Sequence, residues 1–405
     1  MNAEKKQQLE YAVITLFSML GIMVFMAIML GNGLSTDNPY NTYSLQADSW
    51  RQGRLHLGQD YPWLELAIFE GKYYCSFPPF PSYVLFPFTF FYGSDTPDFR
   101  IMYAINILLT VYLYKLALKL GTSPQAAMFL TLFVTISANT LFIMQKPSVW
   151  LFAQLLCVTT AVMAIYYAYI GKGSIALFWW ACSVGCRPMQ IVFLPVLLVF
   201  LYVCERQKQE GVSGVKLILN RWYWIIPMTI VALSYMLLNY LRFGSVFEFG
   251  HNYLPEFVRA EKGQFHVDYM ANNIKSLFHL PEVTDQGKLV IDHFGNLNFM
   301  LASPIVIAAI LGLVYATVQR DRKILGMGLL TMVLVVIYLI ITVMHRTMGG
   351  WHFGNRYTID ILPYIFVLVG LISAKYPKLV KYYVPLCVYG CMLNVVGTIV
   401  VFNGW

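Results

Sequence analysis

The sequence predicts an all-α polytopic membrane protein with about 11 transmembrane helices, on the evidence of its composition and of its long apolar runs. Of the 405 residues, 58% are apolar or aromatic and 12% are charged, about half the ~25% charged share of an average soluble protein. A globule of this length has too little interior to bury so much apolar surface, so the excess must face lipid. This composition excludes a soluble enzyme and a disordered chain.

Apolar runs long enough to cross a bilayer occur along the whole chain. Nine of them are expected at about 11–31, 99–119, 123–143, 149–170, 222–241, 298–318, 324–344, 358–374 and 382–402. The segment 174–204 is too long for one helix, and Gly185-Cys186-Arg187-Pro188 interrupts it. Because proline ends helices and arginine is costly in lipid, we expect two short helices there, with a single helix or a re-entrant segment as the alternatives.

Basic residues in the short loops predict the orientation. With the N-terminus cytoplasmic, 15 of the 28 basic residues but only five of the 20 acidic residues lie on that side. The two long loops, about 32–98 (the first loop) and 243–297 (the second loop), then lie outside, and the odd number of spans places the C-terminus outside. We therefore expect one transmembrane domain over 1–405, whose basic excess sets topology rather than binding nucleic acid.

The first loop begins with Asp37, directly after the first span. A carboxylate at the lip of an apolar span is placed to act as a general base on an approaching hydroxyl or amine. Behind it, apolar and polar residues alternate at helical spacing over 41–52, which predicts a short helix on the membrane surface, ended by Gly53. Asp48, within this helix, is the second candidate catalytic carboxylate.

This layout resembles the GT-C superfamily of integral-membrane glycosyltransferases, nearest to the bacterial aminoarabinose transferases and protein O-mannosyltransferases. Those enzymes carry an acidic motif, often Asp-Glu, after the first span, followed by a tyrosine, a short amphipathic helix and a glycine. Asn38 stands where many relatives have the second acid, so Asp48 is the alternative. The residues that match the layout are Asp37, Tyr40 or Tyr43, and Gly53.

Two further segments are similar to bacterial members of the superfamily. One runs from Leu64-Glu65-Leu66-Ala67 through Gly71-Lys72-Tyr73-Tyr74 to Phe77-Pro78-Pro79. The other contains Gly349-Gly350-Trp351-His352, then Gly354-Asn355-Arg356-Tyr357, and later Pro363. From these segments we take Glu65, Lys72 and His352 as candidate substrate-binding residues, together with Tyr43.

A lipid phosphate needs cations near the membrane surface, and arginine suits it best because its planar fork donates several hydrogen bonds. Arg187 interrupts an apolar segment, where an arginine is costly unless it serves a cavity. Arg356 lies in a glycine-rich loop that lets the backbone approach a ligand closely. Arg242 ends a predicted span, as do His345 and Arg346, and such residues also serve simply as helix-end anchors.

The resemblance implies a membrane glycosyltransferase in the cytoplasmic (inner) membrane that moves a sugar from a polyprenyl-phosphate carrier to a lipid, protein or polysaccharide acceptor. Asp37 or Asp48 would act as base in an inverting displacement, and Arg187, Arg356, Arg242 and Lys72 would bind the carrier. Some relatives use a divalent metal and others do not, so metal dependence stays open. The histidines and acids of the second loop are too dispersed for a compact metal site, and its segment 247–253 is better interpreted as an aromatic rim for a sugar or acceptor.

Three other functions are compatible with parts of the sequence. A surface-glycan ligase or polymerase would use similar exterior loops and arginines but a whole glycan as donor. A transporter or flippase is disfavoured, because its ionisable residues would lie inside the spans, which here are nearly free of charge. A non-catalytic accessory protein of the same fold is the third alternative, and the replacement of the second acid by Asn38 keeps it open.

Overall fold

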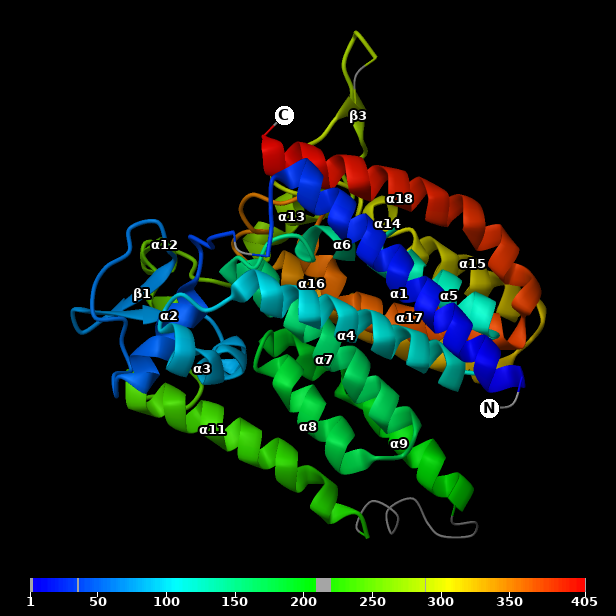
Figure 1. The fold of residues 1–405 in the computed structure, drawn as a ribbon, viewed down its shortest axis with the longest axis horizontal. Helices are drawn as coiled ribbons and strands as arrows, with labels where there is room; N and C mark the ends of the chain where they lie inside the picture. The colour runs from blue at the N-terminus through cyan, green and yellow to red at the C-terminus, as the bar shows by residue number, and fades with distance from the viewer. Residues whose placement is uncertain (1–2, 35, 209–219, 288, 405) are drawn as a thin grey trace. The chain divides into compact units, whose positions relative to one another are not determined.

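The computed structural model describes residues 3–34, 36–208, 220–287 and 289–404. Within these ranges eight helices are long and apolar enough to cross a membrane, and three shorter apolar helices accompany them. Together they coincide with the eleven spans expected from the sequence, and the all-α polytopic membrane fold is confirmed (Figure 1). Glu210 and Lys216, which the charge count assigns to a cytoplasmic loop, lie outside the described residues.

Most of the long helices begin and end close to the limits that hydropathy predicts, and α1 begins earlier than expected, at Ala3. The long ones are α1 (Ala3–Leu30), α4 (Asp98–Lys119), α7 (Val149–Tyr169), α9 (Leu194–Lys208), α11 (Ile225–Phe243), α16 (Arg322–Val343), α17 (Leu362–Lys375) and α18 (Val380–Asn403). Four of them are preceded by 3-10 turns, η1 (Pro188–Phe193), η2 (Trp222–Trp224), η5 (Arg356–Ile361) and η6 (Pro377–Leu379). The shorter apolar helices are α5 (Pro124–Thr135), α8 (Gly173–Val184) and α15 (Ile305–Val318).

Prolines mark several of the breaks between helices. The break predicted in 174–204 is present, because α8 ends at Val184 and η1 begins at Pro188. A proline has no N–H to donate and is therefore best placed in a first helical turn. The run 123–143 is also divided, into α5 and the short α6 (Thr140–Ile143), and α14 (Phe299–Ala302) precedes α15 across Ser303-Pro304.

The first loop contains two helices and a β-hairpin. The predicted helix is present as α2 (Thr42–Arg51), and Gly53 follows it with a φ of +74°. Strands β1 (Leu66–Phe69) and β2 (Lys72–Cys75) pair antiparallel. Helix α3 (Phe80–Tyr92) is not among the expected elements; its Pro81 lies in the first turn, where no N–H is needed, and Pro87 lies inside the helix.

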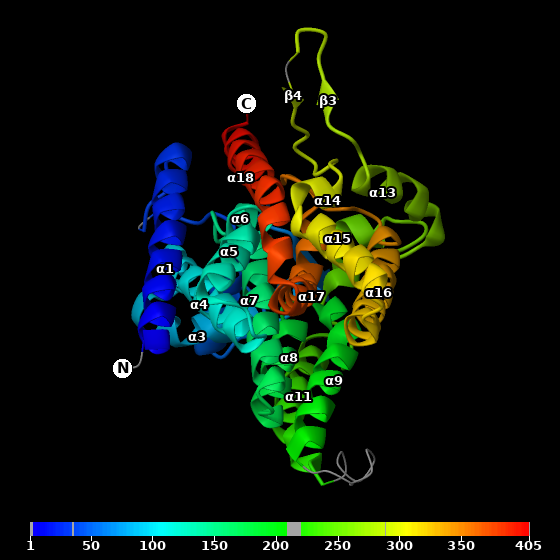
Figure 2. The ribbon, with the colours of Figure 1, turned by 90° about the vertical axis from the view of Figure 1, so that its right-hand side faces the viewer.

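The second loop is built from short elements: η3 (His251–Tyr253), α12 (Pro255–Val258), η4 (Val267–Tyr269), α13 (Met270–Leu277), β3 (Glu282–Val283) and β4 (Leu289–Val290). The two strands pair antiparallel, with Glu282 opposite Val290 and Val283 opposite Leu289. In Figure 2 this hairpin projects beyond α13 and α14.

The chain divides into two compact units. Unit 1 comprises 1–33, 106–145 and 267–405, and unit 2 comprises 34–105 and 146–266. In unit 1, α17 is almost wholly buried and packs against α5, α15 and α16, and α1 packs against α5 and α18. The side-chain amide of Asn403 approaches the Met29 carbonyl oxygen to 3.4 Å, so α1 and α18 run in the same direction (Figure 1).

Glycines in α18 allow two close approaches within unit 1. A Cβ on Gly397 would lie 2.1 Å from the Phe353 ring, and one on Gly390 would lie 2.2 Å from the Ser137 carbonyl oxygen. In unit 2, α7 is almost wholly buried and packs against α8 and α9, α8 packs against α11, and α2 packs against α3. These contacts hold the loop segments that carry the candidate site.

Candidate functional site

Asp37 is exposed, while the side chain of its neighbour Asn38 is firmly anchored. Asn38 Nδ2 donates to Asp98 Oδ2 at 2.9 Å and to the Pro147 carbonyl oxygen at 2.8 Å, and its Oδ1 accepts from the Tyr40 N–H at 3.1 Å. Asn38 is thus a structural anchor that fixes the backbone beside Asp37.

Asp98, the partner of Asn38, is 6% exposed at the start of α4. Besides Asn38, it accepts hydrogen bonds from Ser44 Oγ at 3.0 Å and from the Thr96 hydroxyl. One buried carboxylate therefore joins the loop entry, the first turn of α2 and the segment before α4. The sequence around Asp98 gives little sign of this role, because an acid in the first turn of a helix is commonplace.

A second set of contacts fixes the two residues after Asn38. The Val149 N–H donates to the Tyr40 carbonyl oxygen at 3.0 Å, and the Tyr40 and Trp150 rings lie 5.3 Å apart. Trp63 Nε1 donates to the Pro39 carbonyl oxygen at 3.0 Å. Residues 38–40 are therefore held on both sides, and we call them the anchored loop.

Glu65 and Lys146 belong to the segments that hold the anchored loop. Glu65 is exposed, and its Oε2 accepts a hydrogen bond from Trp150 Nε1 at 2.9 Å. Lys146 directly precedes Pro147, to which Asn38 bonds, and burial lowers the pKa of its ammonium group. Lys146 is a cation that the sequence analysis overlooked, because it lies in a short polar interruption between two apolar runs.

Asp48 is paired within its own helix. Its Oδ1 accepts from Arg51 Nη2 at 2.7 Å and from Arg51 Nε at 2.9 Å, and its Oδ2 accepts from Gln52 Nε2 at 2.5 Å. The carboxylate lies one helical turn beyond Ser44, whose hydroxyl bonds to Asp98. The structure places this second candidate base in an ion pair rather than in the anchored loop.

Tyr43 and Arg242 are buried near Cys75. Tyr43 is 2% exposed, and burial raises the pKa of its hydroxyl, with smaller effects from Cys75 and Cys186, while Arg187 lowers it. Arg242 is 3% exposed and donates to the Cys75 carbonyl oxygen at 3.2 Å and to Asn239 Oδ1 at 3.0 Å. Arg187 lies between α8 and η1. This segment is bonded to the start of α3, because the Phe80 N–H donates to the Gly185 carbonyl oxygen at 3.0 Å.

Lys72 and the predicted aromatic rim lie elsewhere in unit 2. Lys72 is exposed at the turn of the β1–β2 hairpin, opposite Phe69. Within the rim segment 247–253, Glu248 accepts hydrogen bonds from the Gly250 N–H and from Asn252 Nδ2, both at 2.6 Å. The sugar-binding role of this rim stays a prediction.

In unit 1 the structure brings His352 and Arg356 together. His352 is fully buried. Its backbone N–H donates to the His293 carbonyl oxygen at 2.8 Å, and its ring Nδ1 lies 2.7 Å from the Gly350 carbonyl oxygen. Burial, together with a smaller effect of the nearby Arg356, lowers the pKa of His352 to about 3. The imidazole is therefore neutral at physiological pH and packs the loop rather than carrying charge.

Gly349 makes this packing possible. It has a φ of +103°, and a Cβ there would lie 3.1 Å from His352 Cε1, 3.1 Å from Tyr357 Cε2 and 3.3 Å from Arg356 Nε. The Arg356 guanidinium lies over the Tyr357 ring, 4.8 Å from its centroid. Only a residue without a side chain fits such a backbone so close to an arginine and a histidine.

The candidate residues are thus distributed over both units. Unit 2 holds Asp37, Tyr43, Asp48, Glu65, Lys72, Arg187 and Arg242, and unit 1 holds His352 and Arg356. Across the part of the chain that the structure describes, no group of three or more histidines, cysteines and acids is arranged to hold a metal ion.

No protein-family profile matches the sequence, and no curated protein matches it. The structure is similar to the crystal structure of the Archaeoglobus fulgidus oligosaccharyltransferase in the apo form, with a TM-score of 0.47 and 12% identity over 94% of this chain and 56% of that one. It is also similar to the archaeal oligosaccharyltransferase AglB from Archaeoglobus fulgidus in complex with an inhibitory peptide and a dolichol-phosphate, with a TM-score of 0.47 and 13% identity over 96% of this chain and 55% of that one. The chain spans about half the length of these proteins.

Proposed function

We propose that the protein is a membrane glycosyltransferase that moves a sugar from a polyprenyl-phosphate carrier to an acceptor on the exterior face. The observation that carries the proposal is the exposed Asp37 beside the anchored loop, directly after the first span. A general base must be held in a fixed place and still be reachable by the acceptor. The bonds of Asn38 to Asp98 and Pro147 meet the first requirement, and the exposure of Asp37 meets the second.

The reaction is a single displacement. The Asp37 carboxylate takes the proton of an acceptor hydroxyl as its oxygen attacks the anomeric carbon of the donor sugar. The bond between that carbon and the phosphate oxygen breaks, and the electron pair leaves with the polyprenyl phosphate. The anomeric centre is inverted, and Asp37 then releases its proton to water.

The leaving phosphate gains negative charge as the bond breaks, so nearby cations stabilise the transition state. Lys146, next to the Pro147 that anchors Asn38, is our first candidate for this role, and Arg187 and Lys72 of the same unit are the others. Tyr43 and Arg242 are buried, and we assign them to holding α2 and β2 in place. Arg356 and His352 stay predicted ligands in unit 1, and the orientation, with the N-terminus cytoplasmic and the C-terminus exterior, belongs to this proposal.

The decisive test replaces Asp37 by asparagine, which keeps the shape and removes the base. Purified protein is incubated with a panel of polyprenyl-phosphate sugars and a membrane extract, and the release of free carrier is followed. We expect Asp37→Asn to reduce transfer by about 10²-fold or more, as loss of a general base does.

The matched control is Asp60→Asn, which makes the same change at an exposed position of the same loop. Transfer by Asp60→Asn should stay within a factor of two of the unchanged protein at equal expression. Near-normal transfer by Asp37→Asn would remove Asp37 from the role of base. Failure of the unchanged protein to release carrier from any donor would favour a non-catalytic accessory protein.

A further inference from the structure

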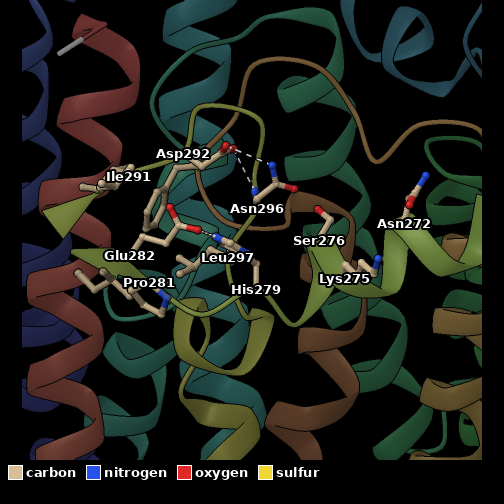
Figure 3. Close-up of a pocket in the computed structure, with 13 residues that line it drawn as sticks. Asn272, Lys275, Ser276, His279, Pro281, Glu282, Ile291, Asp292, Asn296 and Leu297 are labelled. Carbon is tan, nitrogen blue, oxygen red and sulfur yellow. Dashed lines mark hydrogen bonds and ion pairs between the residues drawn. The ribbon is translucent and has the colours of Figure 1, made fainter. Parts of the chain in front are cut away.

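The second loop, together with Phe353 and Leu393, lines an open cavity of about 350 Å³ in unit 1. Helix α13 forms one wall, the β3–β4 hairpin another, and the segment 292–297 a third (Figure 3). Cavities that bind small molecules range from about 300 to 1,000 Å³. The space therefore suits a small ligand or a short part of a larger one.

The walls combine hydrogen-bond donors and acceptors. Asn272, Lys275 and Ser276 line the cavity from α13, and Asp292 and Asn296 line it from the facing segment (Figure 3). An amide and a hydroxyl both donate and accept, a carboxylate accepts, and an ammonium donates. A ligand whose groups can each donate and accept is best matched to such a lining.

The acidic groups are preset by bonds within the protein. Asp292 Oδ1 accepts from the Phe294 N–H at 2.6 Å, and its Oδ2 accepts from Asn296 Nδ2 at 3.1 Å. Glu282 Oε1 lies 3.3 Å from His279 Nε2. Asp292 is therefore held before a ligand arrives, which lowers the entropic cost of binding.

The remaining lining is apolar. Leu297, Phe353 and Leu393 contribute carbon surface, and Phe353 is held against Gly397 of α18. A lining that combines polar and apolar side chains matches a pyranose ring, which carries hydroxyl groups on its rim and C–H groups on its faces.

We propose that this cavity binds a sugar residue of the glycan on which the enzyme acts; this rests on the function proposed above. A phosphate is disfavoured, because Asp292 and Glu282 would repel it at short range. A metal cation is disfavoured, because Lys275 shares the lining. A neutral, hydroxyl-rich ligand is compatible with both the carboxylates and the ammonium group of the lining.

The test blocks the cavity with a large side chain. In Ser276→Trp the indole would fill the space beside α13, and in the control Gln286→Trp it would lie at the exposed turn of the β3–β4 hairpin, outside the lining. Saturation-transfer NMR on the full-length protein in lipid nanodiscs would use methyl glycosides of common hexoses, pentoses and N-acetylhexosamines as probes.

We expect at least one glycoside to give a signal with the unchanged protein and with Gln286→Trp, and the signal to fall at least fivefold in Ser276→Trp. The absence of any glycoside signal, or equal signals from both variants, would overturn the proposal. Competition by inorganic phosphate, with loss of the competition in Lys275→Gln, would identify an anion site and overturn it too.

Two further experiments extend this test. One distinguishes an acceptor sugar from a donor sugar, and the other tests sugar binding separately from the proposed transferase activity. A free acceptor oligosaccharide and a water-soluble short-chain prenyl-phosphate sugar are compared as competitors of the glycoside signal, and the stronger competitor identifies whether acceptor or donor occupies the cavity. Asp37→Asn should keep the glycoside signal while losing transfer. If transfer is absent but Ser276→Trp still loses the signal, the binding site stands and the transferase proposal fails.

Discussion

Beside the anchored loop the reactive candidate Asp37 is exposed and the neighbouring residues 38–40 make the structural bonds, whereas in the segment 345–356 the candidates His352 and Arg356 are themselves buried. The first arrangement leaves a carboxylate accessible on a rigid backbone. The second uses polar side chains as packing elements, with a histidine whose pKa is lowered to about 3 chiefly by burial. Similarity to a family motif therefore points to a position on the chain, and burial decides which part of it can reach a ligand.

The largest effect on stability is expected from Asn38→Asp, which introduces a second acid next to Asp37. It would place a second carboxylate about 3 Å from Asp98 and against the Pro147 carbonyl oxygen. The repulsion and the lost donor should lower the free energy of unfolding by about 2–4 kcal/mol, measured by denaturant titration in detergent.

Asn41→Asp is its control, because Asn41 is the N-cap of α2, where aspartate is equally suitable. It should change the free energy of unfolding by less than about 0.5 kcal/mol. A fully stable Asn38→Asp with enhanced transfer would show that position 38 holds a catalytic acid and that the anchor is dispensable.

The next effect concerns the other side of the comparison, the buried segment. Gly349→Ala would place a methyl group within 3.1–3.3 Å of His352, Tyr357 and Arg356 on a backbone with φ +103°. We expect the free energy of unfolding to fall by about 1–3 kcal/mol, measured as a lower melting temperature in thermal melts. Gly350→Ala, at a position with no atoms within 4 Å and no positive φ, should be nearly neutral in the same thermal melts. Equal melting temperatures for the two variants would contradict the proposed packing.

The pH dependence of stability should report His352. Its pKa is about 3 in the folded protein and about 6.5 when unfolded, so the unfolded state binds the proton first as the pH falls. The stability that the folded protein gains from its neutral, buried His352 is fully present above about pH 6.5 and is lost between about pH 6.5 and 3. In His352→Asn this part of the slope should vanish, while the same change at the half-exposed His56 should retain it. An unchanged slope in His352→Asn would show that other groups cause the acid sensitivity.

The smallest effect is expected from Asp48→Asn, which removes an ion pair within one helix. Such pairs contribute about 0.2–1 kcal/mol near a protein surface. Carrier release should stay within a factor of two, because Asp48 is held by Arg51 and Gln52. Loss of transfer with unchanged stability would instead restore Asp48 as the second carboxylate and weaken the contrast with Asp37.

Much of the fold follows from local pattern. The eleven apolar runs, the break before Pro188 and the helix that ends before Gly53 depend on hydropathy and on proline and glycine geometry, which act over a few residues. Helix α3 has no such signal, because Pro81 in its first turn and Pro87 in its interior are both residues that usually interrupt a helix. The break inside 123–143 depends on contacts made far along the chain and has no local signal.

The amino-acid order alone determined that the chain is a membrane protein with two long loops, and it pointed to Asp37, Arg187 and Arg356, because charge and hydropathy can be counted residue by residue. Tertiary structure decided what Asn38 and Asp98 do, since their roles depend on partners up to 109 positions away. It also decided that His352 and Arg242 are buried while Asp37 is exposed. Solvent access is a property of packed surfaces, so only the folded chain distinguishes a side chain that can meet a substrate from one that holds a loop in place.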